Sequence, residues 1–260
     1  GHSKVDAALM DALPKLEIIA NFGVGVDQID LDAAKQRGII VTNTANVLND
    51  CVADCAIALV LNTLRKFPQA DKYVRAGLWK TQGTYQFTTS LGGKTLGILG
   101  LGRIGEEIAT RTKAFKMNIR YHNRNKKDVP YAYDPDVVTL AKNCDVLVAI
   151  TPGGPETKGI VNAAVLDALG PQGYLVNVAR GSVVDQPVLL KYLQDKKIAG
   201  AGLDVYYDEP NVDPAFYELD NAVLLPHMAS ATNETRTAMG GLQIENILLH
   251  LSGKPVKTPV

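Results

Sequence analysis

The chain has 260 residues, a length that suits one large domain or two modest ones with an ample core. Its 27 basic residues balance 27 acidic ones and long basic runs are absent, so we expect no nucleic-acid partner. The three cysteines, Cys51, Cys55 and Cys144, do not make a disulfide framework and suit a reducing, cytoplasmic compartment. Cys51 and Cys55 share a helical face, but no histidine lies near them, so we expect no metal site.

The most apolar run of the chain is "CVADCAIALVLNTL", which begins at Cys51. It is shorter than the ~20 residues that a membrane-spanning helix needs, and Asp54 interrupts it. We therefore expect a buried helix at about 48–65 and no membrane partner.

Strand and helix patterns alternate along the chain. Two short strands, "LEIIANF" and "GIIVTNT", precede the long helix with another helix between them. Helical stretches such as "RIGEEIATRTKAF", "NAAVLDAL" and "DQPVLLKYLQ" then separate further strands, and "ETRTAMGGLQIENILLHL" is the last helix. Buried strands joined by helices predict an α/β fold with a parallel sheet covered on both faces. The further strands are expected at 94–100, 118–123, 145–150, 173–179, 199–205 and 222–226.

A G-x-G-x-x-G pattern joins the strand at 94–100 to the next helix. Gly100 permits a tight turn, Gly102 lets a pyrophosphate approach the backbone, and Gly105 lets helix and strand lie close together. The amides and the positive dipole end of the helix then face the phosphates. An ordinary glycine turn is the alternative. The expected phosphate-binding residues are Gly100, Gly102, Arg103, Ile104 and Gly105.

The stretch "HNRN" follows the next strand, where an NAD-binding chain usually has an acidic residue for the adenosine ribose. Asn123 lacks the charge that would repel a 2′-phosphate, and Arg124 offers a permanently charged donor fork that suits one. The pattern therefore favours NADPH (NADP) as the cofactor, with NAD possible, over the alternative of a solvated polar loop.

Polar side chains follow several predicted strands at their carboxyl ends, where open parallel sheets bind ligands. A histidine suits proton donation to a carbonyl oxygen at neutral pH, and a carboxylate beside it would fix its tautomer. An arginine can bind a substrate carboxylate and polarise the neighbouring carbonyl. Each residue alone also has a structural explanation, but together they fit reduction of a 2-oxo acid. They are Thr151, Pro152, Arg180, Asp204, Glu209 and His227.

The stretch "NFGVGVDQIDL" places Gly23, Val24 and Gly25 directly after a strand of the smaller set. Successive backbone amides in such a turn make an anion-binding nest, so Val24 and Gly25 are expected to bind a substrate carboxylate. A plain turn between strand and helix is the alternative.

These motifs resemble the D-isomer-specific 2-hydroxyacid dehydrogenases. The resemblance rests on "GLGRIG", "VNVARGSVVD", "GLDVYYDEP" and "LLPHMASAT", and it covers essentially the whole chain. Within the family, "HNRN" and the ending "SGKPVKTPV" are similar to the NADPH-dependent glyoxylate/hydroxypyruvate reductases, which include hydroxyphenylpyruvate reductases. The resemblance implies a Rossmann-type doubly wound dinucleotide-binding domain at 48–231. It also implies a smaller, flavodoxin-like α/β substrate-binding domain, formed by 1–47 and 232–260.

The resemblance also implies a role for each residue at the strand ends. Arg180 orients the 2-oxo acid, His227 is the proton donor in reduction, and Glu209 is its partner. Asp204 contacts the nicotinamide carboxamide, and Thr151, Pro152 and Ala179 lie along that half of the cofactor. Such proteins are usually homodimers, and Tyr85 and Phe87 are candidates for reaching the partner subunit.

The chain departs from the family pattern at its start. Family members normally have two more strands of the small domain before "LPKLEIIANF", so the N-terminal part is expected to be missing here. Two alternatives stay open on the sequence. One is a related enzyme such as a phosphoglycerate dehydrogenase, and the other is a non-catalytic protein that senses dinucleotide.

Overall fold

The computed structural model describes residues 4–260, which divide into two compact units. The small unit comprises the chain up to Cys51 together with Ser230–Val260, and the large unit comprises Val52–Ala229. Within the described residues, no helix combines the length and the apolar character needed to cross a bilayer.

The large unit is built on a seven-stranded sheet in which all neighbouring strands are parallel. The strand order is β5-β4-β3-β6-β7-β8-β9, so the chain runs outward from β3 in both directions. Ligands of such sheets bind beyond the carboxyl ends of the strands, where the order reverses. The strands are β3 (Thr95–Leu99), β4 (Asn118–His122), β5 (Ala132–Tyr133), β6 (Val146–Ala149), β7 (Tyr174–Asn177), β8 (Gly200–Leu203) and β9 (Ala222–Leu224).

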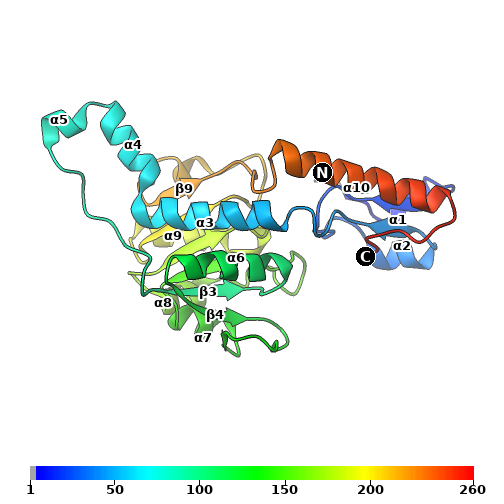
Figure 1. The fold of residues 1–260 in the computed structure, drawn as a ribbon, viewed down its shortest axis with the longest axis horizontal. Coiled ribbons are helices and arrows are strands. Elements are labelled where there is room, and N and C mark those ends of the chain that lie inside the picture. The colour runs from blue at the N-terminus through cyan, green and yellow to red at the C-terminus, as the bar shows by residue number, and fades with distance from the viewer. Residues whose placement is uncertain (1–3) are drawn as a thin grey trace. The chain divides into compact units, whose positions relative to one another are not determined.

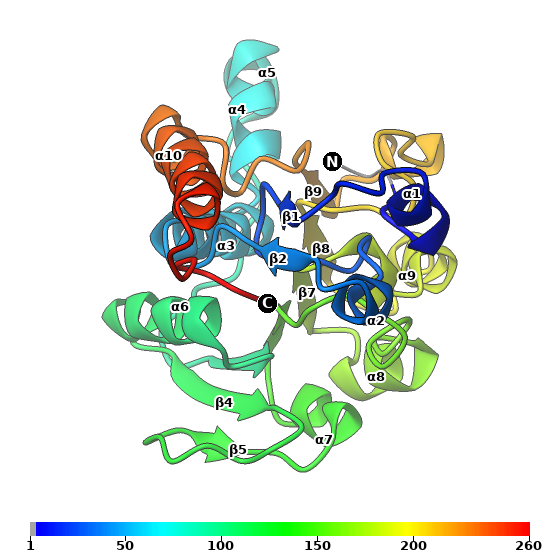
Figure 2. The same ribbon diagram turned by 90° about the vertical axis from the view of Figure 1, so that its right-hand side faces the viewer.

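Helices cover both faces of this sheet, with α3 and α6 on one side and α7, α8 and α9 on the other (Figure 2). The covering explains why every residue of β6, β7 and β8 is buried. The fit is close on the α3 side, because a Cβ at Gly202 would lie 2.6 Å from Thr63 Oγ1. The helices are α3 (Asn49–Arg65), α6 (Arg103–Ala114), α7 (Val137–Lys142), α8 (Ala163–Leu169) and α9 (Gln186–Gln194), with short 3-10 turns at Gly181–Val183 and Pro214–Phe216.

An arm extends from the body of the large unit (Figure 1). It consists of α4 (Phe67–Arg75) and α5 (Leu78–Gln82), followed by an extended segment that returns to β3. Several large apolar side chains of the arm are exposed, among them Trp79 at 65% and Phe87 at 97%.

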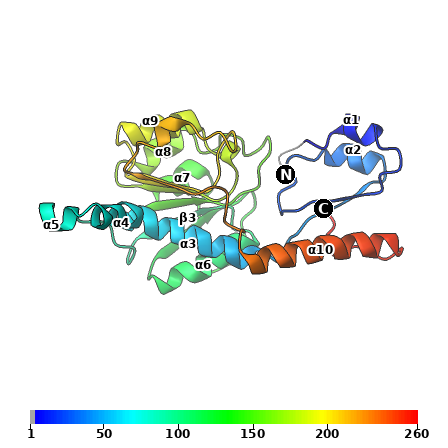
Figure 3. The ribbon, with the colours of Figure 1, turned by 90° about the horizontal axis from the view of Figure 1, so that it is seen from above.

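The small unit has a two-stranded parallel sheet, β1 (Ile18–Ala20) and β2 (Ile40–Thr42). Helices α1 (Ala7–Asp11) and α2 (Leu31–Gln36) lie on one side of it and α10 (Asn233–Leu251) on the other (Figure 3). The chain therefore returns to the small unit through its last helix, and Gln243 of α10 donates a hydrogen bond to the carbonyl of Ala20. Its core comprises Met10, Ile29, Ala33, Ala34, Ile39 and Val41.

The predicted fold class is confirmed as an α/β fold with a doubly wound parallel sheet and a second, smaller α/β unit. Helices α1, α4, α5 and α7 and strand β5 were not predicted from the sequence. Helix α7 has only six residues. Its N-cap is Asp136, whose side chain accepts a hydrogen bond from Thr139 N–H. So short a helix shows too few turns for an apolar period to stand out.

Candidate dinucleotide and catalytic site

The turn between β3 and α6 holds three glycines with different surroundings. Gly100 has a φ of +104°, and a Cβ there would lie 2.8 Å from the nitrogen of Thr151. A Cβ at Gly105 would lie 2.6 Å from the carbonyl oxygen of Gly100. At Gly102 a Cβ would meet none of the described atoms within 4 Å. Close contact between strand and helix therefore requires the outer two glycines, whereas the middle one borders open space.

The N-terminus of α6 opens onto that space. Gly102 is the N-cap residue of this 12-residue helix and supplies no side chain to cap it. Arg103, Ile104 and Gly105 follow in the first turn, whose amides have no acceptor within the helix. Exposed amides and a positive dipole end suit an anion, so these residues fit the pyrophosphate of a dinucleotide cofactor.

The loop after β4 begins with the two residues expected to select the cofactor. The Oδ1 atom of Asn123 accepts from Leu101 N–H at 2.6 Å, and its Nδ2 donates to the Leu101 carbonyl at 3.2 Å. Arg124 Nη1 lies 2.8 Å from Glu156 Oε2, with 83% of the arginine side chain and 74% of the glutamate side chain exposed. Asn123 therefore contacts the phosphate turn itself, whereas Arg124 pairs with the loop that follows β6.

Hydrogen bonds from β4 and β5 hold this loop in shape. The hydroxyl of Tyr121 accepts from Lys127 N–H at 2.8 Å and donates to the Lys127 carbonyl at 3.0 Å. The hydroxyl of Tyr133 donates to the carbonyl of Asn123 at 3.2 Å. The backbone that presents Arg124 is thus fixed by two aromatic residues of the sheet.

A buried ion pair lies under the same loop. Arg120 Nε and Nη2 donate to the two carboxylate oxygens of Asp134 at 2.8 and 2.7 Å, and Asn143 donates to Oδ1 at 2.8 Å. Burial alone would raise the pKa of Asp134, but these hydrogen bonds outweigh it and lower the pKa below its usual value. Asp134 therefore stays charged, because Arg120 and Asn143 donate hydrogen bonds to it, and its pair with Arg120 joins the end of β5 to β4.

The catalytic candidates lie at the same carboxyl edge, beyond β7, β8 and β9. His227 Nδ1 lies 2.6 Å from Glu209 Oε2, and Glu209 Oε1 accepts from Tyr206 N–H at 2.9 Å. The Glu209 side chain is 12% exposed and that of His227 is 41% exposed. The carboxylate is therefore oriented through both of its oxygens, while the imidazole keeps access to solvent.

Asp204 fixes the turn that carries His227. Its carbonyl accepts from His227 N–H at 2.8 Å, and its carboxylate accepts from Met228 N–H at 2.7 Å and Ala229 N–H at 3.0 Å. Burial raises the pKa of Asp204, and the two amides and His227 oppose that rise. His227 has a φ of +51°, a costly conformation for a residue with a side chain, and these three hydrogen bonds hold it there.

Arg180 follows β7 and is oriented by a buried neighbour. The side chain of Asn177 accepts from Ala179 N–H and donates to the Arg180 carbonyl, each at 3.0 Å. Arg180 Nη1 donates to the Ala179 carbonyl at 2.8 Å. The sequence analysis missed Asn177, although an asparagine within the apolar run "YLVNVA" is a signal that a polar side chain is needed inside.

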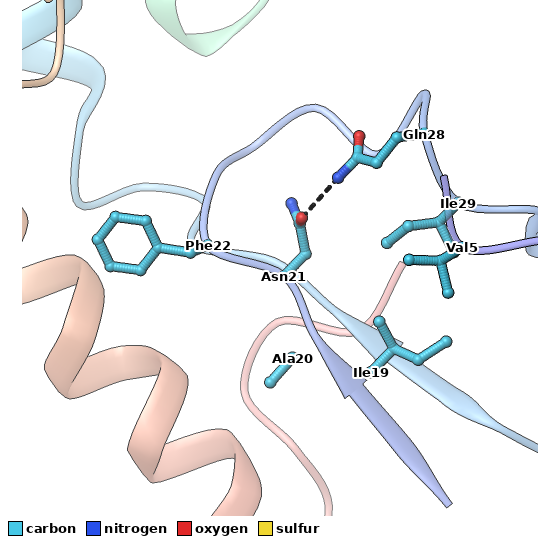
Figure 4. Close-up of a pocket in the computed structure, with 7 residues that line it drawn as sticks. All are labelled: Val5, Ile19, Ala20, Asn21, Phe22, Gln28 and Ile29. Atoms are coloured by element: carbon cyan, nitrogen blue, oxygen red, sulfur yellow. Dashed lines mark hydrogen bonds between the residues drawn. The ribbon is translucent and has the colours of Figure 1, made fainter. Parts of the chain in front are cut away.

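The loop at Gly23–Gly25 belongs to the small unit. Its backbone carbonyls accept hydrogen bonds from asparagine side chains. Asn21 Nδ2 donates to the carbonyls of Gly23 and Gly25 at 3.0 Å each, and Asn43 Nδ2 donates to that of Val24 at 3.1 Å. Gln28 completes the arrangement by donating to Asn21 Oδ1 at 2.7 Å (Figure 4). Fixed carbonyls leave the orientation of the intervening amides fixed as well, as an anion-binding nest requires. Beside the loop is a hollow lined by Val5, Ile19, Ala20, Asn21, Phe22, Gln28 and Ile29.

The large unit thus gathers most of the predicted site residues at one edge of its sheet, in an order that follows the strands. The phosphate turn, Asn123 and Arg124 follow β3 and β4, and Thr151 and Pro152 follow β6. Ala179 and Arg180 follow β7, Asp204 and Glu209 follow β8, and His227 follows β9. Val24 and Gly25 lie in the small unit.

A dinucleotide turn and a carboxylate-paired histidine on one parallel sheet are features of hydride-transferring enzymes. Residues 57–229 match the family model described as the D-isomer specific 2-hydroxyacid dehydrogenase, NAD binding domain. The chain belongs to this family of dehydrogenases.

Particular relatives place it more closely within the family. A hydroxyphenylpyruvate reductase of Plectranthus scutellarioides is 50% identical over 100% of this chain and 83% of its own length. A 2-ketogluconate reductase of Gluconobacter oxydans is 47% identical over 100% of this chain and 84% of its own length. An NADPH-dependent glyoxylate/hydroxypyruvate reductase of Sinorhizobium meliloti, solved with NADP and malonate, is 49% identical and superposes with a TM-score of 0.96 over 99% of this chain and 82% of its own.

Proposed function

We propose that this chain is an NADPH-dependent reductase that converts small 2-oxo acids, glyoxylate and hydroxypyruvate first among them, to D-2-hydroxy acids. The observation that carries the proposal is the 2.6 Å contact of His227 Nδ1 with Glu209 on the sheet edge that also bears the phosphate turn. Relatives at about half identity are named as reductases of glyoxylate, hydroxypyruvate, hydroxyphenylpyruvate and 2-ketogluconate, all 2-oxo acids.

Proton donation is assigned to His227. When bound, the reduced nicotinamide supplies a hydride to the substrate's carbonyl carbon, and negative charge grows on the carbonyl oxygen. Glu209 holds the Nδ1 proton of His227 and stabilises the imidazolium, so that Nε2–H donates its proton to that oxygen. The imidazole then regains a proton from water, which its 41% exposure permits.

Substrate binding is assigned to Arg180 in the large unit and to Val24 and Gly25 in the small unit. The guanidinium binds the carboxylate of the 2-oxo acid and polarises the neighbouring carbonyl. The amides of Val24 and Gly25, within the small unit, are proposed as a carboxylate-binding nest of their own. Asp204, whose carboxylate also accepts from the amides of Met228 and Ala229, is assigned to the nicotinamide carboxamide, and Thr151, Pro152 and Ala179 are assigned to that half of the cofactor.

Cofactor selection is assigned to the loop after β4. Arg124 is 83% exposed and pairs with Glu156, which is 74% exposed, so it can turn to a 2′-phosphate at little cost. Asn123 carries no charge that would repel the phosphate. NADPH is therefore the proposed cofactor and NADH a poorer substitute.

The test is NADPH oxidation, followed by absorbance, with a panel of 2-oxo acids. His227→Ala should lower kcat about 10³-fold, within the 10²–10⁴ that a general acid contributes, while the Kd for NADPH stays unchanged. The matched control is His250→Ala, which removes another histidine paired with a glutamate, Glu17, and should leave turnover as it is. Full turnover in His227→Ala would reject the assignment. Wild-type protein that binds NADPH but reduces no 2-oxo acid would favour a dinucleotide-sensing role.

A homodimer in the cytoplasm completes the proposal. The arm exposes several large apolar side chains, among them Phe67 at 45%, Trp79 at 65% and Phe87 at 97%, and such groups gathered on one segment suit a protein–protein interface. Tyr85 and Phe87 are the residues proposed to reach the partner subunit. Sedimentation velocity should give a dimer for the wild type and a monomer for a Trp79→Ser, Phe87→Ser double variant. Tyr217→Ser, at a site 60% exposed outside the arm, should remain a dimer.

The proposed location in the cytoplasm is argued from the three cysteines. Within the described residues, Cys51, Cys55 and Cys144 form no disulfide, as suits the reducing cytoplasm. Recovery of the enzyme in the cytosolic fraction of its host would support this assignment, and recovery in a secreted fraction would reject it.

A further inference from the structure

The side chain of Asn123 makes two hydrogen bonds to a single residue of the phosphate turn. Its oxygen accepts from Leu101 N–H at 2.6 Å, and its nitrogen donates to the Leu101 carbonyl at 3.2 Å. Leu101 is 0% exposed and stands between Gly100 and Gly102. One carboxamide therefore serves both backbone polar groups of the residue at the centre of the turn.

The turn depends on such outside support. Glycines flank Leu101 on both sides and allow the backbone many conformations, and Gly102 gives α6 no capping side chain. Backbone bonds of this stretch run from Gly100 N–H to the His122 carbonyl at 3.0 Å and from Gly102 N–H to the Gly100 carbonyl at 2.8 Å. Asn123 adds a side-chain tie between the turn and the end of β4.

Only a group with both a donor and an acceptor can make this pair of bonds. An ionised aspartate at position 123 would still accept from Leu101 N–H. Its second oxygen would face the Leu101 carbonyl without a proton between them, which is unfavourable for two partly buried acceptors. The carboxamide therefore matters for the shape of the turn and not only for the charge beside the ribose.

We infer that Asn123 is a positioning residue, which orders the phosphate turn through Leu101 before any cofactor binds. The position that selects the cofactor thus also sets the geometry of pyrophosphate binding. Exchanging Asn123 for an acid therefore lowers the affinity for NADH as well as that for NADPH, which also loses through charge repulsion, instead of simply converting one preference into the other. The kinetic part of this inference rests on the proposed function, but the ordering of the turn does not.

Amide hydrogen exchange in the cofactor-free protein tests the ordering directly. In Asn123→Leu, which keeps the size of the side chain and removes both bonds, Leu101 N–H should exchange at least about tenfold faster than in the wild type. The amide of Ile98, inside β3, should be unaffected. The control is Asn118→Leu, because Asn118 is exposed at the opposite end of β4. Unchanged exchange at Leu101 in Asn123→Leu would overturn the inference.

The pH dependence of KM in Asn123→Asp separates this role from a ribose contact. At pH 8 the ionised acid cannot donate, so KM for NADH should rise about tenfold over the wild type, with kcat within twofold. The Leu101 carbonyl that faces the introduced acid disfavours its charged form and raises its pKa above the usual value of about 3.9. Partial protonation at pH 5 then restores a donor, so the ratio of the two KM values should fall at least threefold. A residue acting only on the ribose hydroxyls gives the opposite result: KM for NADH falls at pH 8 and rises at pH 5. That result would reject the inference. If the protein oxidises neither cofactor, the proposed function fails, while the exchange experiment still decides the role of Asn123.

Discussion

The two ends of the carboxyl edge in the large unit use ion pairs in opposite ways. After β4, Arg124 and Glu156 pair in water, with side chains 83% and 74% exposed. After β8 and β9, Glu209 is 12% exposed and is fixed by the Tyr206 amide as well as by His227. An exposed pair contributes little and changes partners easily, whereas a half-buried pair with further hydrogen bonds keeps its geometry. The ion pair at the end proposed to bind the cofactor's 2′-phosphate can therefore exchange partners, and the ion pair at the end proposed for proton transfer cannot.

Backbone turns at the two ends are nevertheless held by the same device. Asn123 ties Leu101 at one end, and Asp204 ties Met228 and Ala229 at the other. In both, one short polar side chain after a strand accepts hydrogen bonds from amides of a neighbouring loop. The difference lies in charge: Asp204 is 1% exposed, and burial raises its pKa, whereas the carboxamide of Asn123 carries no such cost.

The largest contrast is expected from the same substitution at both ends. Arg180→Lys should lower kcat/KM for a 2-oxo acid about 10²–10³-fold, because a lysine cannot form the planar, two-pronged contact with a carboxylate. Arg124→Lys loses the donor fork but keeps the charge, and a lysine also binds phosphate as a point charge, so KM for NADPH should rise less than about fivefold at this exposed site. Steady-state kinetics with each variant measures both. Equal losses in the two variants would show that Arg180 and Arg124 do not differ in their need for a planar guanidinium.

A smaller effect is expected on stability from the ion pair beneath the cofactor loop. Arg120→Met leaves Asp134 buried without its main partner and should lower the free energy of unfolding by about 2 kcal/mol at pH 7. The folded-state pKa of Asp134 is lowered, so its contribution is present above the unfolded pKa and is lost as pH falls through the folded one. The difference from the wild type should therefore shrink below about pH 4.

Denaturant unfolding at pH 7 and at pH 3.5 measures this difference. The control is Arg75→Met, which removes an exposed pair with Asp71 on α4 and should leave the unfolding midpoint unchanged. A loss in Arg120→Met that persists undiminished at pH 3.5 would show that lost packing, not the charge of Asp134, is responsible.

The smallest effect is expected at Glu156. Glu156→Gln removes the carboxylate that competes with a 2′-phosphate for Arg124, so KM for NADPH should fall about twofold to threefold, the scale of an exposed ion pair. KM for NADH should not change, and the gain should disappear in high salt. An equal gain for NADH would indicate that Glu156 acts on a part of the site common to both cofactors.

Much of the fold and of the site's chemistry could be predicted from local sequence. The strands of the large sheet are continuous apolar runs, and the glycine spacing of Gly100, Gly102 and Gly105 matches contacts that exclude a Cβ at the outer two positions. The residues proposed for catalysis stand directly after strands, where a parallel sheet brings chain-distant positions to one edge. The apolar pattern of a strand, the spacing of the three glycines and the residues that follow a strand all belong to short segments. The sequence by itself therefore determined them.

Other features were decided only by the tertiary structure. Asn123 reaches a residue 22 positions before it, and Asp134 pairs across strands with Arg120. Asn177, Asn21 and Asn43 hold loops through backbone carbonyls that no sequence pattern displays. A hydrogen bond forms where donor and acceptor meet within about 3 Å, and that meeting depends on how separate segments are placed. The sequence therefore determined which chemical groups the site contains, and the fold decided which of them hold the others in position.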